Sequence, residues 1–339
     1  MKLFENVKID PTGYKLVNVR TGRIFEDEGW TLADPEDSSP SLVRAVYDQK
    51  KFNPRDDLRG IYRYADWMPV KRILRKSAAP VTYKSKGLAN WLGLNNLYIT
   101  FSGWNPKIGA RMQTCSFKET EAFSILARMD RKENKVLIVQ SAGNTARAFA
   151  QVCSDNDIPV VICIPQDNLH DMWFRRRLSK CVKVVAVPHG CDYYDAITLG
   201  EKLARSPRFF LEGGAKNVAR RDGMGTTILS CVEKMGRIPD AYFQAVGSGT
   251  GAIAAWENAM ENGCECRRNT EVVKIFIHKR GFEVIIRNRV SGEESTIFAR
   301  GILNCAGIYA DKVREMIGTP TIKIVPTKGT YLVFDSSLK

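Results

Sequence analysis

The stretch VLIVQSAGNTARAFAQVCS, residues 136–154, decides the fold class. It begins with an apolar run typical of a buried strand, and it ends with a segment expected to be helical. A polar glycine turn, Ser141-Ala-Gly-Asn-Thr145, joins the two. A strand, a turn and a helix in this order form the repeating unit of a parallel sheet, in which ligands bind at the carboxyl ends of the strands.

The same alternation extends outward on both sides of this stretch. We therefore expect an α/β fold with a parallel sheet and helices on both of its faces. The expected strands are residues 97–100, 136–139, 160–163, 182–187 and 241–246, and the expected helices include 116–129 and 145–154. Upstream, we expect a hairpin over 13–33 with its turn at Thr21-Gly22, a helix over 41–51, and an aromatic loop over 62–69.

The pattern changes after residue 257. Residues 270–277, 282–287 and 295–298 are expected to be strands joined by short polar turns, which is typical of an antiparallel meander. Residues 302–310 are then expected to form a strand, a small-residue turn and the start of a helix. The two ends of the chain therefore do not follow one design.

Composition narrows the functional classes. The 339 residues are 44% hydrophobic and 26% charged, which is ordinary for a globular protein. The net charge of +14 comes from dispersed Lys and Arg, which favours small anionic substrates over nucleic acid. No signal peptide or membrane span is expected, and the nine cysteines are typical of reduced core thiols, so we expect a cytoplasmic protein. Cys264 and Cys266 have no second pair, so no metal site is expected.

Three runs carry candidate chemistry, and the first contains Lys118. In Ser116-Phe-Lys-Glu119, a capping box would make Lys118 a solvated lysine of the first helical turn. The alternative is a reactive amine, because the positive end of the helix dipole favours the neutral amine that imine formation requires.

The second run is the turn at 141–145, and the third is Gly247-Ser-Gly-Thr-Gly251. Asn144 could contact a ring hydroxyl of a cofactor, and the loop amides could face a substrate carboxylate; a plain Gly-Asn turn is the alternative. The third run could bind a phosphate through its backbone amides. With Ala252 in the last glycine position, it also nearly matches a dinucleotide fingerprint.

Taken together with residues 80–89 and 109–119, the runs 140–147 and 244–251 resemble the threonine synthase-like branch of the fold-type II pyridoxal phosphate enzymes, and most closely its cysteate synthases. The resemblance covers about residues 4–257. It implies pyridoxal 5′-phosphate as cofactor and fold-type II parallel sheets with flanking helices. It also suggests a homodimer.

The resemblance implies a role for each motif residue. Lys118 would hold the cofactor as a Schiff base and Asn144 would contact its ring oxygen. The reaction implied is replacement of the phosphate of O-phosphoserine by sulfite, as in coenzyme M synthesis. The phosphate-binding residues would be Gly247, Ser248, Gly249, Thr250 and Gly251, and the substrate-binding residues would be Ser141, Thr145, Arg111 and Arg147.

Residues 258–339 instead resemble a fragment of an FAD-dependent oxidoreductase of the glycerol-3-phosphate dehydrogenase or D-amino-acid oxidase type, through 258–265, 269–273, 302–313 and 326–332. The expected domains are therefore 1–257, a cysteate synthase-like region truncated at its C-terminal end, and 258–339, an α+β antiparallel fragment. Turnover is then expected to be poor or absent. The alternative functions are an FAD-dependent dehydrogenase or oxidase fragment and an inactive fusion.

Overall fold

The computed structural model of the chain describes residues 9–10, 13–129, 135–239, 242, 244, 249–261, 267, 269–299, 302 and 310–318. Contacts within the chain divide it into two compact units. The first contains residues 1–239 and 247–263, and the second contains residues 240–246 and 264–339. The division at residue 257 into regions of different ancestry stays a prediction.

A small antiparallel sheet begins the first unit, with β1 (Tyr14–Asn18) between β2 (Ile24–Phe25) and β3 (Val43–Tyr47). The predicted hairpin is confirmed. The prediction of a helix over 41–51 is wrong, because this segment contains the strand β3. Within β3 alternate side chains are buried, and this two-residue period is that of a strand with one face on the core.

The aromatic segment that follows is also more ordered than the sequence predicts. It forms a 3₁₀ helix, η1 (Gly60–Trp67), where a loop was expected. Tyr62 and Tyr64 are buried in the main core, which explains why this polar-looking segment is fixed. The helix ends at Trp67, and the extended residue Met68 follows immediately before Pro69, as the proline requires.

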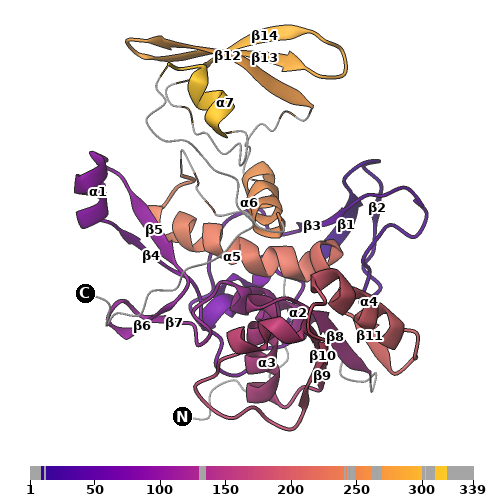
Figure 1. The fold of residues 1–339 in the computed structure, drawn as a ribbon. Coiled ribbons are helices and arrows are strands. Elements are labelled where there is room, and N and C mark those ends of the chain that lie inside the picture. The colour runs from indigo at the N-terminus through magenta and orange to yellow at the C-terminus, as the bar shows by residue number, and fades with distance from the viewer. Residues whose placement is uncertain are drawn as a thin grey trace. The chain divides into compact units, whose positions relative to one another are not determined.

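The centre of the first unit is a parallel sheet, which confirms the α/β class (Figure 1). Its strands are β8 (Val136–Gln140), β9 (Val160–Pro165), β10 (Val182–Val187) and β11 (Phe209–Leu211), in the order β10-β9-β8-β11. Three of these strands were predicted, and β11 was not. The strand expected over 241–246 lies outside the described residues apart from 242 and 244.

One predicted strand belongs to another sheet. Residues 97–100 fall largely in β5 (Tyr98–Phe101), which pairs with β4 (Val81–Lys84) in an antiparallel ribbon and not with the parallel sheet. The residues of β5 are only partly buried, whereas those of β9 are buried throughout. This difference in burial is what separates a two-stranded ribbon from a central parallel strand.

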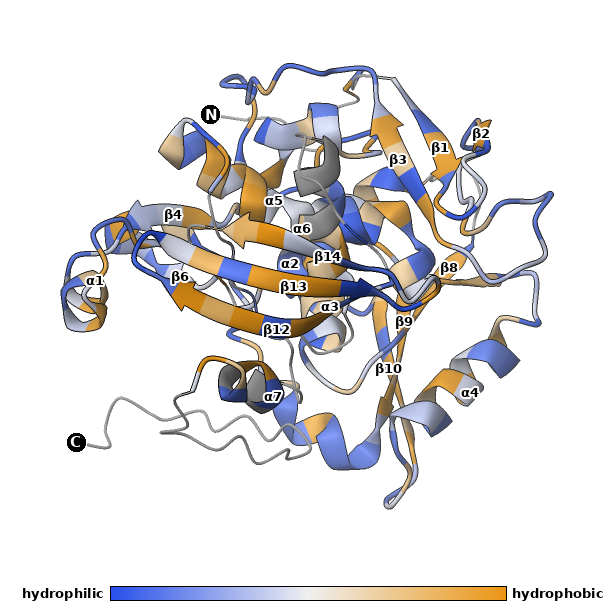
Figure 2. Cartoon of the chain, turned by 90° about the horizontal axis from the view of Figure 1, so that it is seen from above, coloured by the Kyte–Doolittle hydropathy of each residue, from blue (hydrophilic) through white to orange (hydrophobic). Residues whose placement is uncertain are grey.

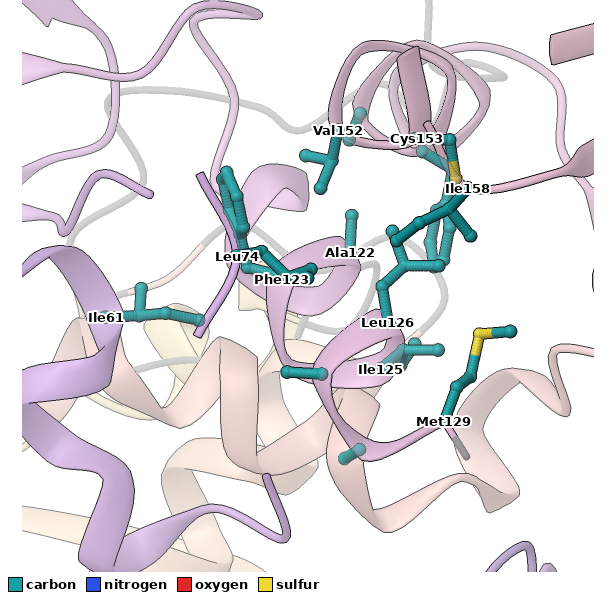
Figure 3. Packing of buried hydrophobic residues seen from close by; sticks show 14 of the residues in the cluster. Ile61, Leu74, Ala122, Phe123, Ile125, Leu126, Met129, Val152, Cys153 and Ile158 are labelled. Carbon is teal, nitrogen blue, oxygen red and sulfur yellow. The ribbon is translucent and has the colours of Figure 1, made fainter. Parts of the chain in front are cut away.

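Helices cover both faces of the parallel sheet, as predicted. On one face, α2 (Lys118–Arg128) and α3 (Asn144–Asn156) bury apolar side chains such as Phe123 and Val152 in one cluster with Leu137 of β8 (Figure 3). On the other face, α4 (Tyr193–Leu203) packs on the alternate residues of β8 and β9. The apolar character of β9 and β10 is visible in Figure 2.

A long helix, α5 (Val218–Met235), packs against α2 and against α6 (Thr250–Glu261). Its approach to α2 is close, because a Cβ added at Gly223 would lie 2.5 Å from the carbonyl oxygen of Thr120. The remaining elements of this unit are α1 (Gly87–Leu92), β6 (Trp104–Asn105), η2 (Pro106–Ile108), β7 (Ala110–Arg111), η3 (Gln166–Asp171) and η4 (Gly214–Lys216).

The second unit contains the antiparallel meander that the sequence predicts. Its strands are β12 (Thr270–His278), β13 (Gly281–Asn288) and β14 (Glu294–Ala299), followed by α7 (Ala310–Glu315). Apart from residues 302 and 310, the expected segment at 302–310 lies outside the described residues, as does 326–332. None of the helices that the structure describes combines the length and the apolar character that a membrane crossing needs.

Candidate functional site

Lys118 is the first residue of α2, and its surroundings differ from the capping box. Ser116 Oγ accepts a hydrogen bond from the Lys118 amide at 3.2 Å, but the residue before the helix is Phe117, whose side chain makes no cap. The buried Glu119 carboxylate accepts from the backbone N–H of Thr114 and not from that of Ser116. The Lys118 side chain is only 17% exposed, so it is not the solvated lysine of the alternative reading.

A buried ionic cluster lies beside the Lys118 amine. Lys118 Nζ is 3.5 Å from Oε2 of Glu121, whose side chain is fully buried. Arg220 of α5 donates to both oxygens of Glu121, each at 3.1 Å, and Thr145 Oγ1 donates to Oε1 at 2.8 Å. Arg220 also donates to Glu212 at 2.5 Å. One guanidinium therefore joins two carboxylates next to Lys118 and the start of α3.

Burial sets the electrostatics of this cluster. Burial raises the pKa of Glu212, while Arg220 opposes that rise. For Arg220 itself, burial favours the neutral form, but Glu121 and Glu212 outweigh it and hold the pKa of the guanidinium above its usual value. Arg220 therefore remains a cation, and the carboxylate that faces Lys118 stays fixed in one orientation.

The polar turn at the carboxyl end of β8 is held by its own serine. Ser141 Oγ accepts from the amides of Gly143 and Ala146 at 3.1 and 3.0 Å. The helix α3 then starts at Asn144, whose side chain is exposed. The backbone N–H groups of Asn144 and Thr145 make no hydrogen bond to any residue that the structure describes. Two amides at a helix start are thus available for an anion.

Arg147 links this turn to the loop in front of Lys118. Its Nη1 donates to Oδ1 of Asn144 at 3.2 Å, and its Nη2 donates to the carbonyl oxygen of Thr114 at 3.0 Å. The guanidinium also lies 3.6 Å from the ring centroid of Trp173. Burial lowers the pKa of Arg147 from its ordinary value, although Cys115, Asp171 and Glu119 counteract this effect.

The third run and Arg111 lie on other elements. Gly249 has φ +80°, a conformation that favours glycine, and no atom would lie within 4 Å of an added Cβ. Thr250 and Gly251 begin α6, whereas Gly247 and Ser248 are outside the described residues. Arg111 is exposed in β7 opposite Trp104, and within the described part of the chain it forms no hydrogen bond or ion pair with Lys118, Asn144 or Arg147.

The structure therefore brings together Lys118, Ser141, Asn144, Thr145 and Arg147, and the helix α5 contacts both α2 and α6. The three members of the ionic cluster are not among the residues that the sequence motifs indicate. Glu121 lies one turn after Lys118, on the same helix face, which is the one local signal available. The other members are Glu212 and Arg220.

The family described as "Pyridoxal-phosphate dependent enzyme" matches residues 84–313. The match extends past residue 257. Nothing in the comparisons supports an FAD-dependent oxidoreductase fragment over 258–339, which stays a prediction.

The chain is also similar to curated proteins of methanogens. It is 48% identical to the cysteate synthase of Methanocella paludicola over 220 residues, which are 65% of this chain and 51% of that protein. It is 50% identical to that of Methanothrix thermoacetophila over 221 residues (65% and 52%), and 40% identical to that of Methanosarcina barkeri over 262 residues (77% and 62%). The chain thus spans about half the length of the first two relatives and somewhat more of the third.

Solved structures match more distantly. O-acetyl serine sulfhydrylase isoform 3 from Entamoeba histolytica has a TM-score of 0.43 and 18% identity, covering 54% of this chain and 55% of that one. A hydrogen sulfide-producing enzyme from Fusobacterium nucleatum has a TM-score of 0.40 and 17% identity, covering 50% and 55%.

Proposed function

The chain belongs to the pyridoxal-phosphate dependent enzymes, and we propose that it catalyses β-replacement on O-phosphoserine by sulfite, giving cysteate and phosphate. The similarity to cysteate synthases supports this choice of reaction. The observation that carries the proposal is the position of Lys118, a mostly buried amine at the start of α2 beside the turn that ends β8.

The residues present fit the cofactor. Lys118 offers a primary amine whose nearest carboxylate is 3.5 Å away, so the amine is not locked in a short ion pair. Asn144 offers an amide at the start of α3, and the turn at Gly249 is open where a Cβ would otherwise stand. An amine, an amide donor and a glycine turn at a helix start match the aldehyde, ring oxygen and phosphate of pyridoxal phosphate.

Bound in this way, the cofactor would supply an electron sink for the carbanion that forms when the substrate loses its α-proton. Lys118 Nζ is the base proposed to take that proton. Glu121, which is held by Arg220 and Thr145, lies 3.5 Å from this amine. The backbone amides of Asn144 and Thr145, which bond no residue in the described part of the chain, are proposed to bind the substrate carboxylate, and Ser141 keeps the turn in shape by capping α3.

The proposed binding of anionic substrates also involves arginine. Arg111 is exposed, as a residue that meets an incoming anion must be. Gly249, Thr250 and Gly251, together with Gly247 and Ser248, are proposed to bind the cofactor phosphate. A homodimer is proposed as the assembly, and a cytoplasmic location as its place in the cell.

The reaction is tested by incubating the purified chain with pyridoxal phosphate, O-phosphoserine and sulfite, and by measuring cysteate by mass spectrometry and phosphate by colorimetry. We expect cysteate and phosphate in equal amounts, and neither with Lys118→Ala. Phosphate without cysteate would reject sulfite as the nucleophile, and sulfide would then be tried in its place. A bound cofactor with neither product would reject the reaction for this chain.

A further inference from the structure

We infer that Arg147 is a positioning residue, which orients the amide of Asn144 so that its Nδ2 donates towards the ring oxygen of the cofactor. This inference rests on the proposed function, because it assumes that pyridoxal phosphate is bound beside Lys118. It goes further by giving Arg147 a role that acts through Asn144 and not through a direct contact with the substrate.

The chemistry of the contact decides the orientation of the amide. A guanidinium has only donors, so the Asn144 atom that faces Arg147 Nη1 at 3.2 Å must be the acceptor Oδ1. The opposite side of the amide is then the NH₂ group. No residue in the described part of the chain accepts from that Nδ2, and the side chain is exposed. The donor is therefore directed away from Arg147 and is available to a ligand.

Arg147 can impose this orientation because it is itself held in place. Its Nη2 is bonded to Thr114 O, and its plane is covered by the Trp173 ring at 3.6 Å. The residue is only 6% exposed, and its Nε is buried without a partner among the described residues. A buried cation that is held by these two contacts can orient the amide it bonds, since little solvent reaches the guanidinium.

The position of Thr114 adds a second effect. Thr114 lies in the loop that leads into Lys118, and Asn144 lies in the turn that follows β8. By bonding both, Arg147 fixes the distance between the segment that carries the amine and the segment that carries the amide. Each of its two terminal nitrogens makes one of these bonds.

A double-mutant cycle tests the inference, with the dissociation constant of pyridoxal phosphate as the readout. We expect Asn144→Ala and Arg147→Met each to weaken binding by about tenfold, on the order of one hydrogen bond. The double variant should also be weaker by about tenfold, because the effect of Arg147 passes through Asn144. The visible absorption maximum of the bound cofactor should shift in the same direction in all three variants.

Arg176→Met serves as the matched control, because Arg176 is an exposed arginine of the same segment as Trp173 and should leave binding within twofold. A hundredfold loss in the double variant would overturn the inference, since Arg147 would then act independently of Asn144. If circular dichroism shows that Arg147→Met is unfolded, the same cycle with Arg147→Lys decides. Absence of a borohydride-stable adduct on Lys118 in the unmodified chain would instead reject the proposed function itself.

Discussion

Replacing Arg220 by methionine should destabilise the first unit strongly, because it leaves two buried carboxylates without their counter-ion. Arg220 makes two bonds of 3.1 Å to Glu121 and one of 2.5 Å to Glu212. Removing one partner of a buried ion pair costs roughly 3–5 kcal/mol. Glu121 retains Thr145 and Glu212 retains the amide of Gly214, so we expect a loss of about 4 kcal/mol at pH 7.5.

The loss should depend on pH with a definite sign. Burial already raises the pKa of Glu212, and Arg220 opposes that rise, so removing Arg220 raises the pKa further. A carboxyl whose pKa is higher in the folded state than in the unfolded state takes up its proton more readily when folded. The free-energy cost of burying the Glu212 carboxylate without its counter-ion is therefore absent at low pH and grows as pH rises. We expect the loss to fall to about 2 kcal/mol at pH 5.

Urea unfolding followed by far-UV circular dichroism measures this difference in the free energy of unfolding. The matched control is Arg75→Met, because Arg75 pairs at 3.1 Å with Asp157, whose side chain is 73% exposed. A pair of this kind contributes below about 1 kcal/mol. A stability loss for Arg220→Met no larger than that for Arg75→Met, or one that is the same at pH 5 and pH 7.5, would contradict this prediction.

Two further predictions concern α2 and its contact with α5. Burial raises the pKa of Glu119 to about 7, so this carboxyl ionises at lower pH in the unfolded chain than in the folded chain. The free energy of unfolding of the unmodified chain should therefore fall by up to about 3 kcal/mol as pH rises from 4.5 to 7. Urea titrations should show that Glu119→Gln flattens this pH profile, and an unchanged profile would contradict the assignment. Gly223→Ala should cost about 1–3 kcal/mol in thermal or urea unfolding, because its Cβ would meet Thr120 O at 2.5 Å, whereas Gly87→Ala, with open space around it, should change stability little.

The parts of the fold that the sequence predicts correctly are those fixed by local pattern. Apolar runs predict the strands β8, β9 and β10, and shorter strand-like runs joined by polar turns predict the meander of β12 to β14. These residue patterns are local, because they follow from which faces of a strand are buried. The segment at 41–51 is different. It contains charged residues that suit a helix. It forms a strand because it pairs with β1, and this pairing buries Val43, Ala45 and Tyr47 on one face.

The candidate site divides in the same way. Lys118 and the turn around Asn144 are predictable, because turn chemistry and a strand-to-helix transition are visible within a few residues. The ion pair between Glu121 and Arg220 joins residues 99 positions apart, and no local pattern marks it. Its partners lie on α2 and α5, which approach each other closely at Gly223.

The central claim is that Lys118 holds pyridoxal phosphate. The measurement that tests it most directly is borohydride reduction of the chain after incubation with pyridoxal phosphate, followed by peptide mass mapping, with Lys118→Ala treated in parallel. We expect one phosphopyridoxyl adduct, on the peptide that contains Lys118, and no adduct at that site in the variant. A modified lysine elsewhere, or an unmodified Lys118 peptide at saturating cofactor, would contradict it.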